Sequence, residues 1–355
     1  MKITIKKLFT FLLTALMISA PALSLLSCSE KVDGGYVLVN GEKVVPEYVM
    51  QIGDKKVSFD EYRYYYLYSR DNNDQGDRTY WDGDGSKAAD LLSYVENNIV
   101  SQYVMQIMAD ELKITLDETD NKDITDNYAS AVEYYGGEDA FNKKLAENYL
   151  TPELYNDLSK TSALTYKAYQ YYYGDNGTMK FTDEEYADYF EKNYYAAYNI
   201  LFLYAEGEDA TNCPETIKKI NEISERIKNG EDFITLSTTV GDDIEGMKAN
   251  PNGYHFTEGD MVGEFYNTVK SLEINGISEP FTTSYGCHIV MRVPLNADTR
   301  ESMKEKVLYG YTDSYNNWVS GYYETLYQEL VNDKKESITV KYSDIYDKIS
   351  PTTVY

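Results

Sequence analysis

Histidine and cysteine are scarce in this sequence of 355 residues, which contains two histidines and three cysteines. The histidines are His255 and His288, and the cysteines are Cys28, Cys213 and Cys287. No C-x-x-C pair, H-E-x-x-H motif, G-x-S-x-G elbow or glycine-rich phosphate loop is present. The common motifs of zinc enzymes, serine hydrolases and nucleotide-binding proteins are therefore missing, and we expect neither a metal nor a cofactor.

Positive charge is also in short supply, because 33 lysines and arginines face 59 aspartates and glutamates. The formal net charge of −26 would repel both nucleic acid and anionic lipid headgroups. We therefore expect no nucleic-acid partner. An acidic surface favours solubility and suits basic or unfolded polypeptides as partners.

A long apolar run lies at the N-terminus, in MKITIKKLFTFLLTALMISAPALSLLSCSE. Lysines precede it, which is typical of a secretory signal peptide, here residues 1–27. A small residue before Cys28 resembles the lipobox of bacterial lipoproteins, in which the cysteine becomes the lipidated first residue. This resemblance implies that Cys28 and a short tether, 28–35, anchor the mature protein to the cell membrane outside the cytoplasm. A plain cleaved signal with an incidental cysteine, or an uncleaved transmembrane helix, is the alternative.

The segment after the tether, residues 36–194, is predicted to be mostly helical. It opens with two hairpin signals, in YVLVNGEKVV and VMQIGDKKVS. Ser58 and Glu61 then have the capping-box form that opens a helix. Apolar periodicity and capping residues predict further helices at 86–113, at 123–150, at 152–173 and after Thr182.

The acidic loop DNNDQGDRTYWDGDG has part of a calcium-binding spacing. Asp71, Asn73 and Gly76 match positions 1, 3 and 6 of an EF-hand loop. Gln75 and Asp82 stand at positions 5 and 12, where stronger ligands are expected. A solvated loop is therefore the preferred interpretation.

Tyrosine is abundant, with 38 residues against 11 phenylalanines and 2 tryptophans. A tyrosine can bury its ring while its hydroxyl reaches water or a partner. We interpret most of these tyrosines as core and rim residues. Platforms for a ligand, as in a sugar-binding lipoprotein, are the weaker alternative, because no two-lobed α/β pattern is present.

The pattern changes at residue 195, where AAYNILFLYAE predicts a buried strand. Helices at 214–228 and 261–272 and strands in GYHF, ISEPFTT and CHIVMRV predict a compact α/β unit over 195–297. A helical pattern resumes in VLYGYTDSYNNWVSGYYETLYQELV, and a polar tail ends the chain. We predict an α+β fold in which this α/β domain is inserted in a helical domain, with residues 298–355 packing back on the N-terminal region.

A series of short motifs runs through residues 196–296: ILF, then NGEDFITLSTTVGDD, then NGYHFTEGDMVGEFYNTVKSLEINGISEPFTTSYGCHIVMR. In order and spacing they resemble parvulin-type peptidyl-prolyl isomerases, whose pattern includes G-x-x-F-x-x-L-A, M-V-x-x-F, L-x-x-G-x-I-S-x-P and T-x-Y-G-Y-H-I. The chain as a whole is similar to the PrsA/SurA-like extracytoplasmic foldases. VSFDEYRYYYLYSR and KYSDIYDKI resemble the helical part of such lipoproteins. The resemblance implies a small antiparallel sheet with surrounding helices.

The resemblance also implies a substrate-binding site for proline. Met261 and Phe265 of the M-V-x-x-F motif would form the walls of the proline pocket. Phe256 and Tyr285 would complete the contacts with the substrate.

The same resemblance assigns four residues to catalysis. It places Asp243 near the substrate carbonyl, Thr283 in a hydrogen-bond relay and His288 at the pocket floor. The family usually has a second histidine in its first strand, where this chain has Asn199, and Gly241 replaces the usual serine of the S-D element. Because Asn199 can still donate and accept hydrogen bonds, we expect reduced activity rather than none.

Taken together, these features predict a membrane-anchored prolyl isomerase and chaperone that acts on unfolded or nascent secreted polypeptides at X-Pro segments. The alternative is a non-catalytic holdase with a degenerate parvulin domain, for which Asn199 is the strongest indication. His255 is expected to be a strand residue without a catalytic role. A homodimer is compatible with the resemblance, although no residue pattern specifies one, and a disulfide between Cys213 and Cys287 stays open.

Overall fold

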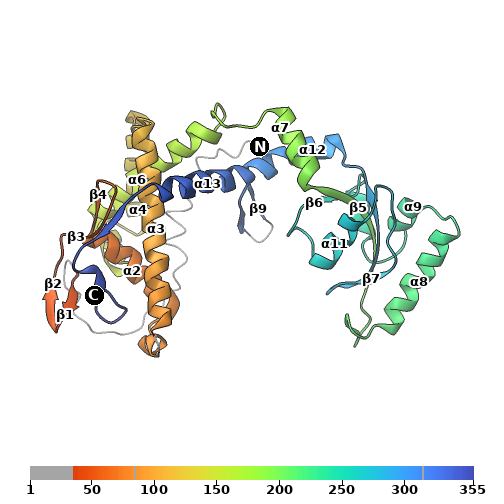
Figure 1. The fold of residues 1–355 in the computed structure, drawn as a ribbon, viewed down its shortest axis with the longest axis horizontal. Helices are drawn as coiled ribbons and strands as arrows, with labels where there is room; N and C mark the ends of the chain where they lie inside the picture. Colours follow the sequence, from red (N-terminus) through yellow and green to blue (C-terminus); the bar gives the residue numbers. More distant parts are fainter. Residues whose placement is uncertain (1–34, 84, 314–315) are drawn as a thin grey trace. The chain divides into compact units, whose positions relative to one another are not determined.

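The computed structural model contains two compact units and describes residues 35–83, 85–313 and 316–355. The unit formed by Met1–Lys180 and Tyr323–Tyr355 is called the helical unit below, and Phe181–Tyr322 is called the sheet unit (Figure 1). The expected signal peptide and Cys28 lie outside the described residues, as does the tether up to residue 34.

The helical unit combines long helices with short strands. Its helices are α2 (Phe59–Asp74), α3 (Ser86–Glu111), α4 (Glu118–Tyr134), α5 (Glu138–Glu147), α6 (Pro152–Tyr173) and α13 (Tyr322–Glu336), with the 3₁₀ turns η1 (Arg78–Trp81) and η2 (Tyr346–Lys348). Its strands are β1 (Val37–Val39), β2 (Glu42–Val44), β3 (Tyr48–Ile52), β4 (Lys55–Ser58) and β11 (Val340–Tyr342). Both predicted hairpins are present, as β1–β2 and β3–β4. Ser58 caps α2 as expected, because its hydroxyl accepts the Glu61 N–H.

The C-terminal segment belongs structurally to the N-terminal part of the chain. Within the predicted polar tail, Val340–Tyr342 forms the strand β11, which was not predicted and which extends β3 in the order β11-β3-β4. At the chain end, Tyr355 exchanges backbone hydrogen bonds with Tyr36. Residues more than 280 positions apart therefore pair in one small sheet and form hydrogen bonds beside it.

Aromatic residues fill the core of the helical unit. Helix α3 packs against both α2 and α6. One cluster of buried residues consists of Tyr64, Phe141, Leu145, Leu150 and Tyr155. The ring of Phe141 lies edge-on to that of Tyr155, with centroids 5.5 Å apart, a geometry that aromatic pairs favour. The interpretation of tyrosines as core residues holds for this cluster.

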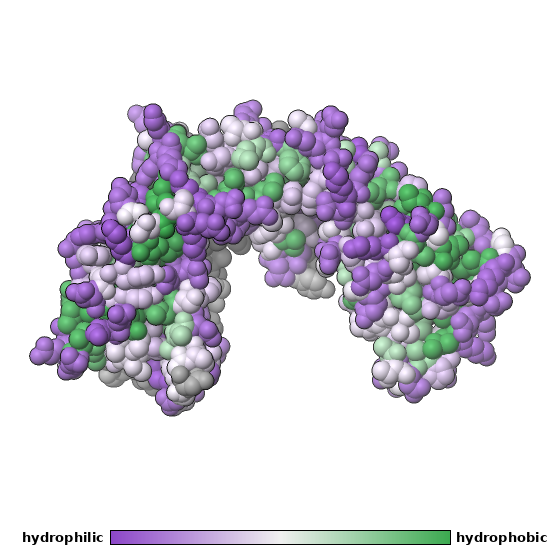
Figure 2. All heavy atoms as spheres, viewed as in Figure 1, coloured by the Kyte–Doolittle hydropathy of each residue, from purple (hydrophilic) through white to green (hydrophobic). Residues whose placement is uncertain are grey.

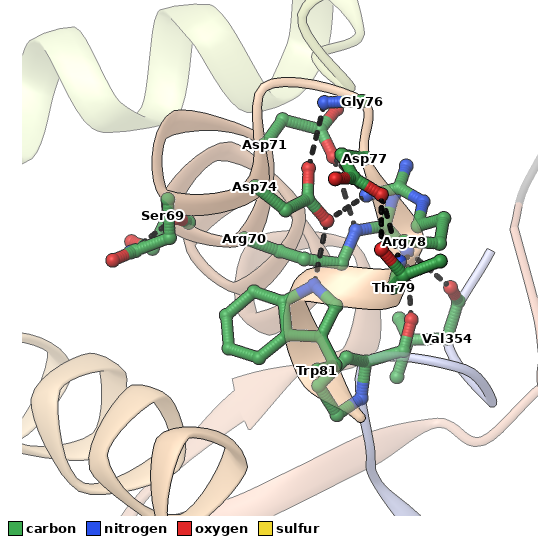
Figure 3. Close-up of polar contacts among 12 residues, drawn as sticks. Ser69, Arg70, Asp71, Asp74, Gly76, Asp77, Arg78, Thr79, Trp81 and Val354 are labelled. Atoms are coloured by element: carbon green, nitrogen blue, oxygen red, sulfur yellow. Dashed lines mark hydrogen bonds and ion pairs between the residues drawn. The ribbon is translucent and has the colours of Figure 1, made fainter. Parts of the chain in front are cut away.

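Charged side chains hold the end of α2 (Figure 3). Asp74, whose side chain is 0% exposed, accepts hydrogen bonds from Trp81 Nε1 at 2.6 Å and from Arg78. Asp71 pairs with Arg70 and Arg78. Two carboxylates at a helix C-terminus are unfavourable next to the helix dipole, and the arginines offset that cost. Residues 71–74, which were expected to begin a solvated loop, instead form the last turn of α2, and the carboxylates of Asp71 and Asp74 bind arginine.

Arg70 also reaches the C-terminal segment. Its Nη1 donates to the backbone carbonyls of Pro351 and Val354, at 3.3 and 3.1 Å. The Arg70 side chain is only 7% exposed. One buried guanidinium thus joins α2 to the end of the chain.

The sheet unit contains a central sheet with helices on both sides. Its helices are α7 (Asp183–Asn193), α8 (Pro214–Lys228), α9 (Phe233–Ser237), α10 (Ile244–Ala249), α11 (Gly263–Ser271) and α12 (Ala297–Tyr309). Its strands are β5 (Tyr195–Leu203), β6 (Tyr254–Phe256), β7 (Phe281–Thr282), β8 (Gly286–Val293), β9 (Tyr311–Thr312) and β10 (Trp318–Val319). Thr182 caps α7 with the predicted capping box, in which Glu185 binds back to the Thr182 N–H.

The four-stranded sheet has the order β6-β5-β8-β7, and every neighbouring pair is antiparallel. Side chains alternate between its two faces. Ile200 and Ile289 point into a core that includes residues of α8 and α9. Ala197 and Val290 point to the other face, where α11 packs. The predicted α+β fold, a small antiparallel sheet with helices set between helical N- and C-terminal segments, is confirmed.

Several predicted element boundaries are wrong. The single helix expected at 123–150 is split into α4 and α5, because Gly136 and Gly137 have positive φ angles of 88° and 121°. The helical pattern expected in VLYGYTDSYNNWVSGYYETLYQELV is interrupted by the β9–β10 hairpin. Helix α10 is absent from the prediction, and ISEPFTT contributes only the two residues of β7.

Cys213 and Cys287 are both buried and free, with their Sγ atoms 3.9 Å apart. Cys213 precedes α8, and Cys287 lies on the face of β8 that packs against it.

Hydrophilic side chains cover most of the visible face of each unit (Figure 2), in keeping with the acidic composition. Among residues 35–83, 85–313 and 316–355, no helix is both long and apolar enough to span a bilayer.

Candidate active site on the sheet unit

The α11 face of the central sheet carries the predicted site. Asn199 on β5 and His288 on β8 both point to this face, two residues along their strands from Ala197 and Val290. The β5–β8 register pairs Leu201 with His288 and Asn199 with Val290, so the two polar side chains are diagonal neighbours. Strand pairing thus brings together residues that are 89 positions apart.

A chain of hydrogen bonds runs through these side chains. Thr283 Oγ1 lies 2.9 Å from His288 Nε2, and His288 Nδ1 lies 3.0 Å from Asn199 Oδ1. Asn199 Nδ2 donates to Asp243 Oδ2 at 2.8 Å. The backbone N–H of Tyr285 donates to Thr283 Oγ1 at 3.1 Å. The four residues predicted to be catalytic therefore form one continuous network.

The donor and acceptor chemistry fixes the direction of this chain. An ionised carboxylate only accepts hydrogen bonds, so the Asn199 amide must turn its NH₂ toward Asp243 and its oxygen toward His288. His288 must then carry its proton on Nδ1, which leaves Nε2 to accept the Thr283 hydroxyl.

Burial keeps His288 neutral. The residue is 4% exposed, and desolvation lowers its pKa from 6.5 to about 4. A neutral imidazole with both nitrogens hydrogen-bonded is a poor general base at neutral pH. The network is therefore suited to holding hydrogen bonds in place rather than to transferring protons.

An apolar cluster borders the histidine. The ring of Phe265 lies edge-on to His288 with centroids 5.8 Å apart, and Phe281 stacks on His288 at 5.4 Å. Phe256 packs behind Phe265 with ring centroids 5.5 Å apart. Met261 packs against the same cluster and is half-buried, as is Phe281.

The predicted substrate-binding residues differ in their exposure. Phe265 and Phe256 are 4% and 1% exposed, which makes them the base of the apolar cluster. Met261 is more accessible. Tyr285 is 63% exposed, and the hydrogen bond that joins it to the network comes from its backbone.

His255 lies apart from the network, on β6. Its Nδ1 contacts the Gly253 carbonyl at 3.1 Å, and its Nε2 accepts the Asn296 N–H at 3.0 Å. Both ring nitrogens are thus used to join β6 to the segment before α12. This agrees with the expectation of a strand residue outside the site.

Sequence reasoning missed two residues that contact the site. The Tyr254 hydroxyl donates to Asp243 Oδ1 at 3.0 Å, and the Phe281 ring stacks on His288. Phe281 carried a weak signal, because it belongs to the strand-like run ISEPFTT. Tyr254 likewise belongs to the predicted strand GYHF, but nothing in the sequence indicated its contact with Asp243, which depends on the loop between Asp243 and β6.

The described part of the chain contains no group of three or more His, Cys, Asp or Glu residues arranged to hold a metal ion.

Comparison with known proteins gives this arrangement a family context. Residues 200–293 match the family model "Rotamase: PPIC-type PPIASE domain". The foldase protein PrsA of Caldanaerobacter subterraneus subsp. tengcongensis is 28% identical to the chain, over 91% of this chain and 89% of that protein. PrsA of Halalkalibacterium halodurans is 30% identical over 36% of each chain.

Among solved structures, that of peptidylprolyl isomerase (PrsA) from Bacillus cereus aligns with a TM-score of 0.37 and 19% identity, covering 72% of this chain and 88% of that chain. The resemblance to the PrsA/SurA-like foldases that the motifs indicate is confirmed by the family model and by the similarity to PrsA over most of both chains. This chain is PrsA-like over most of its length and contains a PPIC-type parvulin rotamase domain.

Proposed function

We propose that this chain is a membrane-anchored, extracytoplasmic peptidyl-prolyl cis/trans isomerase and chaperone that acts on unfolded secreted polypeptides. The observation that carries the proposal is the juxtaposition of two features on one face of the sheet. The neutral network from Thr283 through His288 to Asn199 lies directly against the apolar cluster of Phe265 and Phe281.

The chemistry of isomerisation suits a site of this kind. Rotation about an X-Pro bond crosses a barrier of roughly 20 kcal/mol, and no covalent bond is made or broken. An enzyme lowers this barrier by binding the twisted amide more tightly than the planar one. An apolar wall that holds the proline ring and a few fixed hydrogen-bonding groups are sufficient, and a nucleophile is not required.

Each side chain has a role in this proposal. The proline ring would pack against the accessible part of the apolar cluster, at Met261 and Phe281, with Phe265 below. The network from Thr283 to Asp243 would provide a rigid polar floor under the twisted amide. Because His288 stays neutral, the floor places no extra positive charge beside the substrate.

A non-catalytic holdase is the second candidate. It is favoured by Asn199 in place of the usual histidine and by the way Thr283, His288 and Asn199 satisfy one another's hydrogen bonds. In that case the sheet unit would bind peptides without accelerating isomerisation.

Two-dimensional NMR exchange on a short X-Pro peptide separates the two candidates. We expect the parent protein to accelerate exchange between the cis and trans peaks, and Phe265→Ala to abolish the acceleration, because it removes the ring beneath the proline. Phe233→Ala is the matched control, since Phe233 is a similarly buried phenylalanine in the core on the α8 and α9 side of the sheet. Acceleration that survives Phe265→Ala would reject the proposed site. A folded parent without any acceleration would favour the holdase.

The location of the protein rests on the N-terminal sequence and on the similarity to PrsA. Cys28 would carry the lipid after residues 1–27 are removed. In a bacterial host, Cys28→Ala should release the mature protein from the membrane fraction and eliminate labelling by a fatty acid. Continued labelling of Cys28→Ala would overturn the anchor assignment.

A further inference from the structure

We propose that Tyr254 is a positioning residue for the isomerase site: by holding Asp243, it sets the orientation of Asn199 and so the tautomer of His288. This inference rests on the function proposed above. It concerns a contact at the far end of the hydrogen-bond chain, two side chains away from the histidine.

The carboxylate of Asp243 is held from two sides. Asn199 Nδ2 binds one oxygen, Oδ2, at 2.8 Å, and the Tyr254 hydroxyl binds the other, Oδ1, at 3.0 Å. Tyr254 comes from β6 and Asn199 from β5, which are neighbours in the sheet. The loop residue Asp243 is thus fixed by two rigid strands.

In this chain of hydrogen bonds, only the Asp243 carboxylate determines which groups donate and which accept. A histidine, an amide and a hydroxyl can each donate or accept, so Thr283, His288 and Asn199 alone allow two opposite arrangements. The carboxylate can only accept, and it therefore selects the arrangement with the proton of His288 on Nδ1.

The surroundings of Tyr254 fit this role. Burial, followed by the charge of Asp243, raises the pKa of the Tyr254 phenol, so the hydroxyl remains a donor at neutral pH. Gly246 leaves the space that the contact needs. A side-chain carbon built at Gly246 would overlap both the Tyr254 hydroxyl and Asp243 Oδ1.

Removal of the Tyr254 hydroxyl should loosen the hydrogen-bond chain from Thr283 to Asp243 without removing any of its four side chains. Asp243 would keep only the Asn199 hydrogen bond and would move more freely toward solvent. Asn199 could then rotate its amide, and His288 would exchange between its two tautomers. The apolar cluster around Phe265 would be unchanged.

The test compares Tyr254→Phe with Tyr186→Phe in the full chain. Tyr186 is a matched control, because it is a buried tyrosine in α7 whose hydroxyl donates to the Arg300 carbonyl at 2.9 Å, outside the site. For Tyr254→Phe we expect the exchange rate at saturating X-Pro peptide to fall about tenfold, with an unchanged peptide dissociation constant. Tyr186→Phe should change neither quantity.

Nitrogen-15 NMR of the imidazoles gives a readout that a purely structural role would not change. The parent should show His288 as a single tautomer with its proton on Nδ1, and Tyr254→Phe should show averaged nitrogen shifts. His255 is an internal reference, because its partners Gly253 and Asn296 hold the same tautomer independently. The chain has no other histidine, so the two rings are readily assigned.

Gly246→Ala supplies a second variant, which should displace the Tyr254–Asp243 contact and shift the His288 signals in the same direction. An unchanged His288 tautomer in folded Tyr254→Phe would overturn the inference. If the parent is active, an isomerisation rate of Tyr254→Phe equal to that of the parent would overturn it as well. A parent without isomerase activity would contradict the proposed function, but the nitrogen shifts would still decide whether Tyr254 sets the tautomer.

Discussion

At the scale of single residues, burial alone, without a charged neighbour, lowers the pKa of His288 and keeps its imidazole neutral. Desolvation lowers its pKa to about 4, and its two hydrogen-bonding side chains are both neutral. Where the family usually has a second histidine, Asn199 cannot titrate. The site should therefore keep one protonation state over the whole range in which an ordinary histidine changes.

This predicts that isomerase activity is independent of pH between about 8 and 5, without the inflection near 6.5 that a free histidine would cause. Imidazole signals of His288 followed by NMR titration should stay in the neutral form over the same range. An inflection near 6.5 that coincides with titration of His288 would contradict the buried network.

The same pKa shift affects stability. Because the pKa of His288 is lower in the folded chain, the unfolded chain takes up a proton first as the pH falls below about 6.5. This group alone should lower the free energy of unfolding by about 3 kcal/mol between pH 6.5 and pH 4. Denaturant unfolding of the parent and of His288→Gln should show that loss only in the parent. An equal pH dependence of the two proteins would contradict the assignment.

Sequence motifs located His288, Phe265 and Met261 because these residues stand at fixed spacing within elements that the pattern also predicts. Tyr254 and its bond to Asp243 could not be found in this way. That contact requires the pairing of β6 with β5 and the exact path of the loop around α10, which periodicity does not encode.

At the scale of elements, the turn before Asp243 depends on backbone conformation. Gly241 has a φ of +90°, which glycine adopts readily, and an added Cβ would lie 2.5 Å from the Leu201 carbonyl oxygen. The adjacent Asp242 N–H donates to that same carbonyl at 2.7 Å. This gives a physical reason for glycine where the family usually has serine.

Gly241→Ala is therefore expected to destabilise the sheet unit by more than about 1 kcal/mol and to lower the isomerisation rate, because it displaces the turn that carries Asp243. Gly230→Ala is the matched control, since Gly230 has a φ of +92° and open space around it. Gly230→Ala should lower the free energy of unfolding through backbone strain, but it should leave the isomerisation rate unchanged. Equal effects of the two substitutions on rate would contradict the steric explanation.

In the helical unit, the end of α2 depends on Arg70. Arg70→Met keeps the apolar stem but leaves Asp71 and the carbonyls of Pro351 and Val354 without their buried donor. We expect a loss of about 3 kcal/mol in the free energy of unfolding. Urea titration monitored by fluorescence of Trp81, which binds Asp74 in the same cluster, measures this change.

Arg226→Met is the comparison for Arg70→Met, because Arg226 pairs with Glu231 on the surface and its side chain is 43% exposed. Its effect on stability should be much smaller. A small effect of Arg70→Met as well would show that the C-terminal segment is held by other contacts.

The capping residues Ser58 and Thr182 and the N1 residue Pro152 predicted the starts of their helices well, because these signals act within one helical turn. The β9–β10 hairpin was missed for the opposite reason. Gly310 and Gly321 approach each other's backbone so closely that a side chain at either would overlap it. Two isolated glycines in a helical pattern do not reveal such a contact.

At the scale of the whole molecule, the chain leaves the helical unit near Lys180 and returns near Tyr323. The sheet unit is therefore a continuous segment with its own cores on both faces of its sheet. An expressed fragment of residues 181–322 should fold cooperatively and keep its isomerase activity. A fragment that is soluble but lacks dispersed amide signals in NMR would contradict this independence.

The sequence pattern predicted that the α/β domain is inserted in a helical domain, because the change from helical periodicity to strand-like runs at Tyr195 is abrupt. The return of the chain end to the N-terminal region was predicted, but the pairing of β11 with β3 and the contact of Arg70 with the chain end could not be predicted from periodicity. These contacts depend on Arg70 and on a three-residue strand, and both act across nearly the full length of the chain.

The proposed function requires the sheet unit to catalyse rotation about X-Pro bonds. The most direct test is the cis/trans exchange rate of an X-Pro peptide, measured by NMR with and without a catalytic amount of the folded parent chain. We predict that exchange in the presence of the protein is far faster than the uncatalysed exchange, which takes roughly tens of seconds. Exchange that stays at the uncatalysed rate, while peptide signals show that the peptide binds, would contradict it.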